Sequence, residues 1–255
     1  MTIAKLLLNI RPVELAEVIK AALGISYREV RIGDHNMWID PASNFGNRVV
    51  TDGMYEPDFT STLLGLLKPG DHFVDLGANE GWFSLLASKV VGPAGRVYVI
   101  EPQARLWPVI HQNFILNQRR NYTLIPYAVG EKEGFIELAL NPSLNSGAST
   151  AVPSRRRKHY RHQKVGVMPL AKLMESYGIS TVAVLKVDIE GFELNALRSL
   201  GKRLSDGSIH NILLEVHPMQ LKQLGQTIEQ IVCLLTDSGY KDSGAEKHSF
   251  WTRRA

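Results

Sequence analysis

The sequence predicts an α/β domain in which helices cover both faces of a doubly wound, mostly parallel sheet. From Pro57 onward, short strands alternate with helices, and strands such as 72–76 and 96–100 are apolar along nearly their whole length. A strand that is apolar on both sides must be buried on both faces, which is typical of parallel sheets. Right-handed crossovers between such strands then favour a doubly wound arrangement.

The individual elements follow from hydrophobic periodicity and from the turn residues between periodic segments. We expect helices at 58–67, 82–91, 104–117, 192–200 and 219–238, and strands at 72–76, 96–100, 122–129, 182–187, 211–216 and 248–252. Insertions at 135–140 and 141–164 interrupt the alternation.

Residues 1–55 are predicted to form an N-terminal extension to a main domain over 56–255. Apolar residues recur at helical spacing over 12–23, and Pro12 suits a first helical turn. Residues 28–40 and 48–51 look strand-like, with turn residues between them. We expect this extension to pack on the main domain or to form part of a lid over it.

The composition is that of an ordinary globular protein, with 44% hydrophobic residues among 255 and a net charge of +4. This charge permits an acidic partner without requiring nucleic acid. Cys233 is the only cysteine, so an intrachain disulfide is excluded, and its apolar neighbours predict a buried thiol. The apolar start is short and lacks a cleavage pattern, so we expect a cytoplasmic protein without membrane insertion. No oligomeric state is predicted.

The most informative local motif is Asp75-Leu76-Gly77-Ala78-Asn79-Glu80-Gly81, which joins the first strand to its helix. Glycines at 77 and 81 allow a tight turn and a close approach of the backbone to a ligand. The helix start offers unpaired N–H groups to an anion. The spacing differs from the Gly-x-Gly-x-x-Gly dinucleotide fingerprint, which argues against a nicotinamide-dependent oxidoreductase. It suits a cofactor that carries an amino acid and a single nucleoside.

Two further strand ends fit such a cofactor. The second strand ends in Glu101-Pro102, and an acid at this position can accept hydrogen bonds from both hydroxyls of a ribose. The third strand ends in Ala128-Val129, where backbone groups could frame an adenine. A glycine loop alone is often purely steric, but three successive strand ends with fitting chemistry indicate a cofactor site.

Polar side chains also follow the fourth and fifth strands, at the edge where open α/β sheets bind ligands. Asp188, Glu190 and His217 are candidate general bases, and the pKa of histidine suits neutral pH best. Simpler readings stay open: Glu190 and Glu193 could complement a helix start, Lys186 could neutralise a neighbouring acid, and His217 could satisfy a turn. The carboxylates at 188, 190 and 215 could also gather a divalent metal ion through oxygen ligands.

On these residues, the chain resembles the FkbM family of methyltransferases. The resemblance extends from about Met54 to His217 and is carried by the following segments: Tyr55-Glu56, the motif from Gly70 to Gly81, Val99-Ile100-Glu101-Pro102, Leu185 to Glu193, and Leu213 to His217. The Gly147-Ala148-Ser149 stretch matches a serine-containing loop of the family more loosely.

The resemblance implies a seven-stranded, Rossmann-like sheet of the class I methyltransferase type, with a final antiparallel strand. It implies S-adenosylmethionine as the donor and O-methylation of a hydroxyl on a polyketide, a sugar or a related small metabolite. Asp188 would lie near the transferred methyl group and Glu101 at the ribose. The remaining donor contacts that it implies are Glu56, Asp75, Gly77, Asn79, Gly81, Pro102, Ala128 and Val129.

Two alternative functions stay open. The basic run over 155–162 is read first as a solvated loop, but it could contact RNA, with Tyr160 stacking on a base. That reading would make the chain an RNA methyltransferase. A cofactor-binding module without catalytic activity is the other alternative, against which the titratable groups at the strand ends argue.

Overall fold

The computed structural model describes residues 3–152, 159–243 and 249–253. Its centre is a seven-stranded sheet in the order β11-β12-β10-β9-β3-β4-β5. The strands of this sheet are β3 (His72–Leu76), β4 (Arg96–Ile100), β5 (Tyr122–Ile125), β9 (Val182–Val187), β10 (Ile209–Leu214), β11 (Tyr240–Asp242) and β12 (Ser249–Arg253). Strands β5, β4, β3, β9 and β10 pair in parallel, whereas β12 is antiparallel to β10. The predicted fold class, including the antiparallel last strand, is confirmed.

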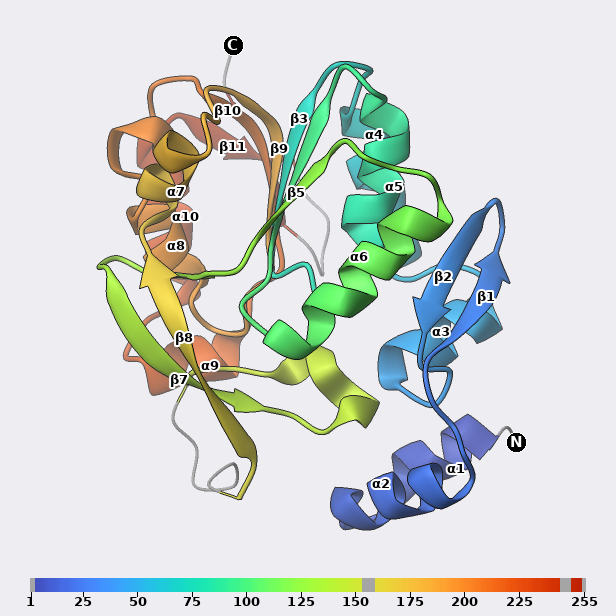
Figure 1. Cartoon of the computed structure of the whole chain (residues 1–255). Helices are drawn as coiled ribbons and strands as arrows, with labels where there is room; N and C mark the ends of the chain where they lie inside the picture. Colours follow the sequence, from blue (N-terminus) through green and yellow to red (C-terminus); the bar gives the residue numbers. More distant parts are fainter. Residues whose placement is uncertain (1–2, 153–158, 244–248, 254–255) are drawn as a thin grey trace.

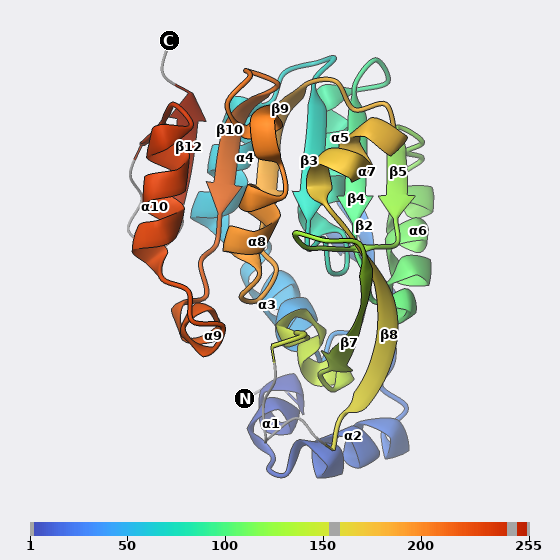
Figure 2. The same ribbon diagram turned by 90° about the vertical axis from the view of Figure 1, so that its left-hand side faces the viewer.

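The chain reverses its direction of travel across the sheet between β3 and β9. After β3 it adds β4 and β5 on one side, and then returns to place β9 on the other side of β3. Such a switch point leaves a crevice outside the carboxyl ends of the strands, where ligands bind in open α/β sheets. In Figure 2 the arrowheads of β3, β4 and β5 all point down toward this edge.

Helices cover both faces of the sheet (Figure 1). One face carries α4 (Pro57–Leu66), α5 (Trp82–Val91) and α6 (Trp107–Leu116), and the other carries α7 (Leu170–Ser176), α8 (Glu193–Arg198) and α10 (Ile228–Asp237). Alternate strand residues enter separate apolar clusters: Phe73 packs with α4 and α5, whereas Val74 packs with α7 and α8. This double burial explains why the strands are mostly apolar.

The predicted third strand, 122–129, is wrong in its length. β5 ends before Pro126, which has no N–H to continue the ladder. Ala128 and Val129 instead form the short strand β6 of a separate three-stranded sheet with β7 (Gly134–Leu140) and β8 (Arg161–Met168). This small sheet projects beyond the carboxyl edge of the main sheet (Figure 2).

The predicted N-terminal extension contains α1 (Ile3–Asn9), α2 (Val13–Ala22), a hairpin of β1 (Arg28–Ile32) and β2 (His35–Ile39), and α3 (Asn44–Asp52). The predicted strand at 48–51 is therefore wrong. The side chain of Ser43 accepts a hydrogen bond from the Gly46 N–H at 2.8 Å and starts a helix there, and the left-handed Gly53 ends it. The extension packs on the main domain, because Met37, Phe45 and Val49 join the same apolar cluster as α4 and α5.

Smaller differences concern the helix bounds. The predicted helix at 104–117 begins with a 3₁₀ turn, η1 (Ala104–Leu106). The predicted helix at 219–238 is divided into α9 (Pro218–Gln223) and α10, because Gly225 turns left-handed and Thr227 caps a new helix start. Further 3₁₀ turns are η2 (Ser143–Ala148) and η4 (Gly201–Leu204). The prediction of a buried Cys233 is wrong, since its side chain is exposed on α10.

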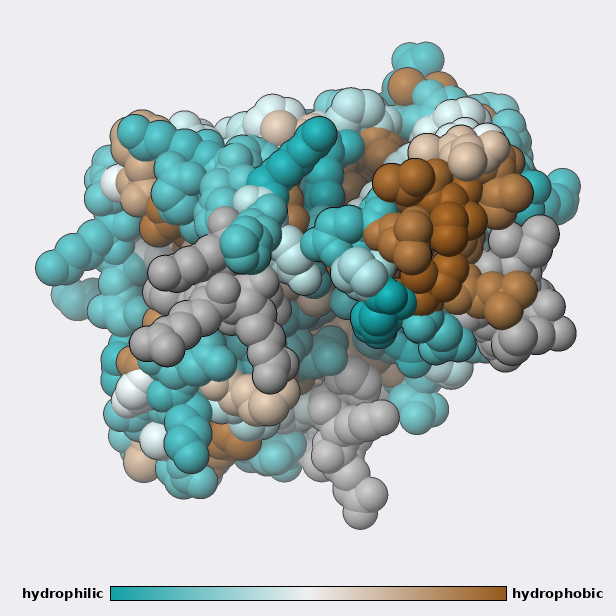
Figure 3. Space-filling view, turned by 90° about the horizontal axis from the view of Figure 1, so that it is seen from below, coloured by the Kyte–Doolittle hydropathy of each residue, from teal (hydrophilic) through white to brown (hydrophobic). Residues whose placement is uncertain are grey.

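A patch of apolar surface lies on the right of Figure 3, on the side of α1 and α2. The large apolar side chains exposed on these helices include Leu6, Leu15 and Val18. Within the described ranges, no helix has the length and apolar character needed to cross a bilayer. The cytoplasmic location stays a prediction.

Candidate active site

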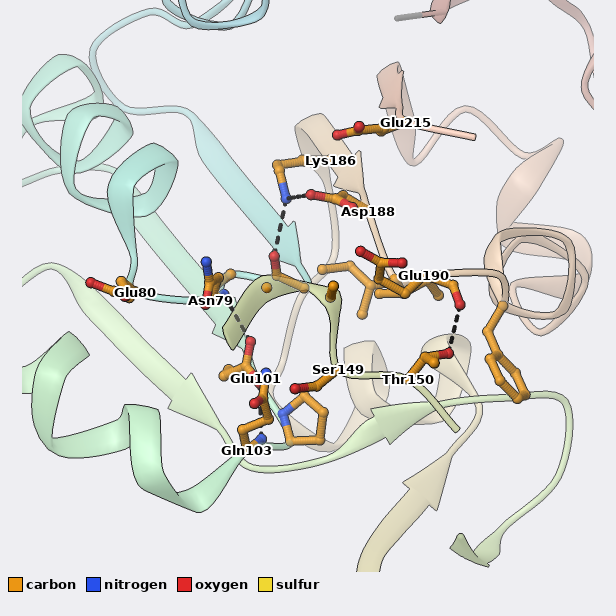
Figure 4. Close-up of a pocket in the computed structure, with 18 of the residues that line it drawn as sticks. Asn79, Glu80, Glu101, Gln103, Ser149, Thr150, Lys186, Asp188, Glu190 and Glu215 are labelled. Carbon is orange, nitrogen blue, oxygen red and sulfur yellow. Dashed lines mark hydrogen bonds and ion pairs between the residues drawn. The ribbon is translucent and has the colours of Figure 1, made fainter. Parts of the chain in front are cut away.

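A cavity of about 350 Å³ lies at the carboxyl edge of the main sheet. Figure 4 shows Glu101 and Gln103 at one end of it and Lys186, Asp188 and Glu215 at the other. Such a volume is within the usual range for small-molecule sites. The wall combines the ends of β3, β4, β9 and β10 with residues of α3, η2 and the small sheet.

The glycine loop fits its position only without a side chain at residue 77. Gly77 has a φ of +83°, and a Cβ placed there would lie 1.8 Å from the carbonyl oxygen of Asp188. Its N–H donates to the carbonyl of Ile100 at 3.0 Å. The turn after β3 is therefore tied to β4 on one side and to the segment after β9 on the other.

Glu101 is held by the main chain. Its Oε2 accepts a hydrogen bond from the Asn79 N–H at 2.8 Å, and its Oε1 accepts one from the Gln103 N–H at 2.9 Å. Its carboxylate is buried, with 3% of the residue exposed. Burial raises the pKa of Glu101 to about 7, against the opposing effect of these hydrogen bonds. The structure thus places a preoriented acid beside the glycine loop.

Two predicted donor contacts, Asp75 and Gly81, do not line the cavity. Asp75 is fully buried, where it accepts a hydrogen bond from Ser84 Oγ at 2.6 Å and pairs with Lys186 Nζ at 3.2 Å. Gly81 caps α5 in a left-handed conformation. Both residues support the loop from behind, and any direct contact with a donor stays a prediction.

Lys186 links β3, the glycine loop and the segment after β9. Its buried Nζ donates to the Gly77 carbonyl at 3.1 Å and lies 3.4 Å from Asp188 Oδ2. Burial by itself would lower the pKa of Lys186, but the carboxylates of Asp75 and Asp188 raise it above its ordinary value. The lysine is therefore a fixed cation, as the simpler reading of the sequence expected.

The predicted bases Asp188, Glu190 and His217 do come together at the cavity wall. His217 Nε2 lies 3.7 Å from Glu190 Oε1 and 3.9 Å from Asp188 Oδ1. On the other side of the ring, Nδ1 is 2.8 Å from the Oε1 of Glu193, which also accepts the Gly191 N–H. Burial opposes protonation of this ring, but the hydrogen bond to Glu193 and the surrounding carboxylates raise the pKa of His217 to about 9.

Glu215 was not among the predicted catalytic residues, although it lines the cavity. Burial, followed by repulsion from Asp188 and Glu56, raises the pKa of Glu215 to about 7. The signal for it was available in the sequence, because Glu215 follows an apolar strand in the same way as Asp188 does. Among the described residues, no group of three His, Cys, Asp or Glu side chains is arranged to hold a metal ion.

Pro102, Ala128 and Val129 line the cavity near Glu101, although Ala128 and Val129 belong to β6 rather than to the main sheet. The Gly147-Ala148-Ser149 stretch also lines it. The preceding turn lies against the glycine loop, with Ser146 Oγ donating to Asn79 Oδ1 at 3.1 Å. Of the basic run, residues 155–158 lie outside the described residues, while Arg161 and His162 are exposed at the start of β8.

The N-terminal extension contributes wall residues that the sequence did not single out. Asn44, Phe45 and Arg48 of α3 face the cavity together with Tyr55, and the predicted donor contact Glu56 lies beside them. The predicted turn before residue 48 and the predicted strand over 48–51 hid that Phe45 and Arg48, three positions apart, share one face of a helix.

The residues that line the cavity fit a cofactor that carries a nucleoside and an amino acid. Glu101 is a buried acid beside the glycine loop that can accept hydrogen bonds from hydroxyl groups, and Gly77, Ala78 and Asn79 of the loop line the cavity. At the opposite end, carboxylates and an imidazole could take or give a proton.

Comparison with known proteins agrees with this chemistry. Residues 75–241 match the family model of the methyltransferase FkbM domain. The methyltransferase sdnD of Sordaria araneosa is 24% identical over 225 residues, which covers 76% of this chain and 83% of that protein. Two solved structures share 12% and 11% identity, with TM-scores of 0.46 and 0.43. They are an S-adenosylmethionine-dependent O-methyltransferase from Thermotoga maritima (93% of this chain, 82% of that one) and an rRNA methylase from Streptococcus thermophilus (76% and 94%). These structural similarities are too low to bear on function.

Proposed function

The chain belongs to the FkbM methyltransferase family, and we propose that it transfers a methyl group from S-adenosylmethionine to a hydroxyl of a small metabolite, such as a polyketide or a sugar. The observation that carries the proposal is one cavity with a ribose-type acid at one end and a cluster of acid–base groups at the other. The family implies the donor. The hydroxyl acceptor is the proposed part.

At the donor end, Glu101 is assigned to the two ribose hydroxyls. Its carboxylate is already oriented by two backbone N–H groups and keeps lone pairs for a ligand. Gly77 and Asn79 would contact the region between the ribose and the amino acid, and Ala128 and Val129 would frame the base. When bound, S-adenosylmethionine supplies an electrophilic methyl group on a sulfonium.

At the acceptor end, the chain must orient a hydroxyl and remove its proton. His217 is protonated at neutral pH, because its pKa is raised to about 9, and so it suits a hydrogen-bond donor to the acceptor oxygen. A carboxylate then serves as the base. Asp188 and Glu190 are the predicted candidates, and Glu215 joins them because a pKa of about 7 matches the working range.

The proposal is tested by incubating the protein with labelled S-adenosylmethionine and a panel of hydroxylated, amine-bearing and RNA acceptors. We expect label on neutral hydroxyl compounds. Transfer to RNA alone or to amines alone would contradict the proposal, and binding of the donor without transfer to any member would favour the cofactor-binding module.

The role of Asp188 is tested with Asp188→Asn, which keeps the shape of the side chain. We expect methyl transfer to slow by at least about a hundredfold, the lower range for loss of acid–base assistance. The midpoint of urea unfolding should stay close to that of the wild-type protein. Asp237→Asn, on the exposed end of α10, is the matched control and should leave the rate unchanged. A wild-type rate in Asp188→Asn would remove Asp188 from the chemistry.

A further inference from the structure

The wall that the N-terminal extension contributes carries two opposite charges. Arg48 of α3 and Glu56, just before α4, both line the cavity. Glu56 adopts a left-handed backbone conformation, with a φ of 44° and a ψ of 72°. Such a conformation is unfavourable for a residue with a side chain, and it persists mainly where the surroundings or a ligand site require it.

Aromatic rings support the Arg48 side chain. The Arg48 guanidinium lies over the ring of Tyr55, 5.2 Å from its centroid. Tyr55 in turn packs edge-on against Phe45, with 5.1 Å between the ring centroids, and in a tilted arrangement against Phe83, with 6.1 Å between them. Phe83 belongs to the first turn of α5, directly after the glycine loop. The ring that carries Arg48 therefore packs on the first turn of the helix that follows the glycine loop.

Arg48 differs from the other cations of the cavity in its partners. Lys186 is paired with Asp75 and Asp188, and His217 is paired with Glu193. Within the described residues, by contrast, no carboxylate forms an ion pair with Arg48. A guanidinium stacked on a ring keeps its N–H edge available for bidentate binding of a carboxylate.

We propose that Arg48 and Glu56 bind the zwitterionic amino-acid end of the donor, Arg48 through the carboxylate and Glu56 through the ammonium group. This proposal rests on the donor end of the proposed function and is independent of the acceptor. The start of α5 favours a carboxylate nearby, because the N-terminus of a helix carries partial positive charge. The extension is then part of the donor site, and not only a cover for the acceptor.

Calorimetric titrations with three ligands distinguish the role of Arg48 from that of Glu56. S-adenosylhomocysteine carries both groups, decarboxylated S-adenosylmethionine keeps the ammonium but lacks the carboxylate, and 5′-methylthioadenosine lacks both. In Arg48→Met we expect affinity for S-adenosylhomocysteine to fall about tenfold, the equivalent of about 1.4 kcal/mol. Affinity for the other two ligands should not fall. In Glu56→Gln, affinity for the first two should fall and that for 5′-methylthioadenosine should not.

Arg31→Met and Glu29→Gln are matched controls, because both residues are exposed on β1 and do not line the cavity. Equal losses for all three ligands would indicate a merely structural role and would overturn the proposal. An unchanged affinity of Arg48→Met for S-adenosylhomocysteine would also overturn the proposal, because it would show that Arg48 does not bind the carboxylate of the donor. If the wild-type protein bound none of the ligands, the donor assignment of the proposed function would fail as well.

Discussion

The two ends of the cavity are built in different ways. At the donor end, the main chain sets the geometry: Gly77 leaves no room for a side chain, and backbone N–H groups orient Glu101. At the acceptor end, side chains from separate elements orient each other, as His217 and Glu193 do. Backbone geometry does not depend on pH, whereas the protonation of a cluster of carboxylates around an imidazole does. We therefore expect substitutions at the donor end to act on fold and affinity, and substitutions at the acceptor end to act on protonation.

The largest effect should follow from Gly77→Ala at the donor end. The added Cβ would overlap the Asp188 carbonyl, and the left-handed φ adds strain. Overpacking of about 1–3 kcal/mol and backbone strain of about 1–2 kcal/mol predict a loss of roughly 2–5 kcal/mol in the free energy of unfolding. Urea denaturation measures it, and binding of S-adenosylhomocysteine should be lost as well.

Gly178→Ala is the matched control, because Gly178 is also left-handed but has no atom within 4 Å of an added Cβ. Its free energy of unfolding should fall only by the cost of the backbone strain. Equal losses in the two variants would mean that the close approach of the glycine loop to Asp188 contributes nothing.

A smaller effect is expected for Glu101→Ala. Removing the acceptor of the ribose hydroxyls should weaken binding of S-adenosylhomocysteine by about 1–3 kcal/mol. Because burial raises the pKa of Glu101 to about 7, wild-type affinity should also rise between pH 6 and 8, as the carboxylate ionises. Calorimetry across this range measures both quantities. Glu137→Ala, on the exposed face of β7, should behave as wild type. An unchanged dissociation constant in Glu101→Ala would contradict the ribose assignment.

The smallest effect should be Glu193→Gln at the acceptor end, where the outcome is a shifted titration. Glu193 raises the pKa of His217 through its hydrogen bond and its negative charge. Glutamine can still accept a hydrogen bond but carries no charge, so the pKa of His217 should fall by about one unit, or about 1.4 kcal/mol. The imidazolium stabilises the fold fully below the ordinary histidine pKa of about 6.5, and this contribution is lost as the pH rises through about 9. Nuclear magnetic resonance of the imidazole measures the shift. Glu131→Gln is the matched control, because Glu131 is an exposed acid paired with Arg198, and it should leave the pKa of His217 unchanged. A His217 pKa that did not move would show that Glu193 only caps α8.

Much of the main domain could be predicted because its signals are local. An apolar strand followed by a polar residue locates a strand end, and parallel strands bring their ends to one edge whatever their order. Glu101, Asp188, Glu190 and His217 are thus placed at the cavity without any knowledge of their contacts. Prediction failed for 48–51, because the Ser43 cap, and not the apolar pattern, decides that this segment is a helix. It failed again for 126–129, where Pro126 ends the strand.

The sequence by itself determined the order of the elements, the strand ends that bear chemistry and the family. Only the tertiary structure decided which charges are paired and which are available. His217 looked like the base best matched to neutral pH, yet Glu193, buried 24 positions earlier in the chain, favours its protonated form. Glu215 looked like one acid among several, until burial beside Asp188 and Glu56 raised its pKa. The physical reason is that ionisation depends on burial and on charges a few ångströms away, which are distances set by packing and not by spacing along the chain.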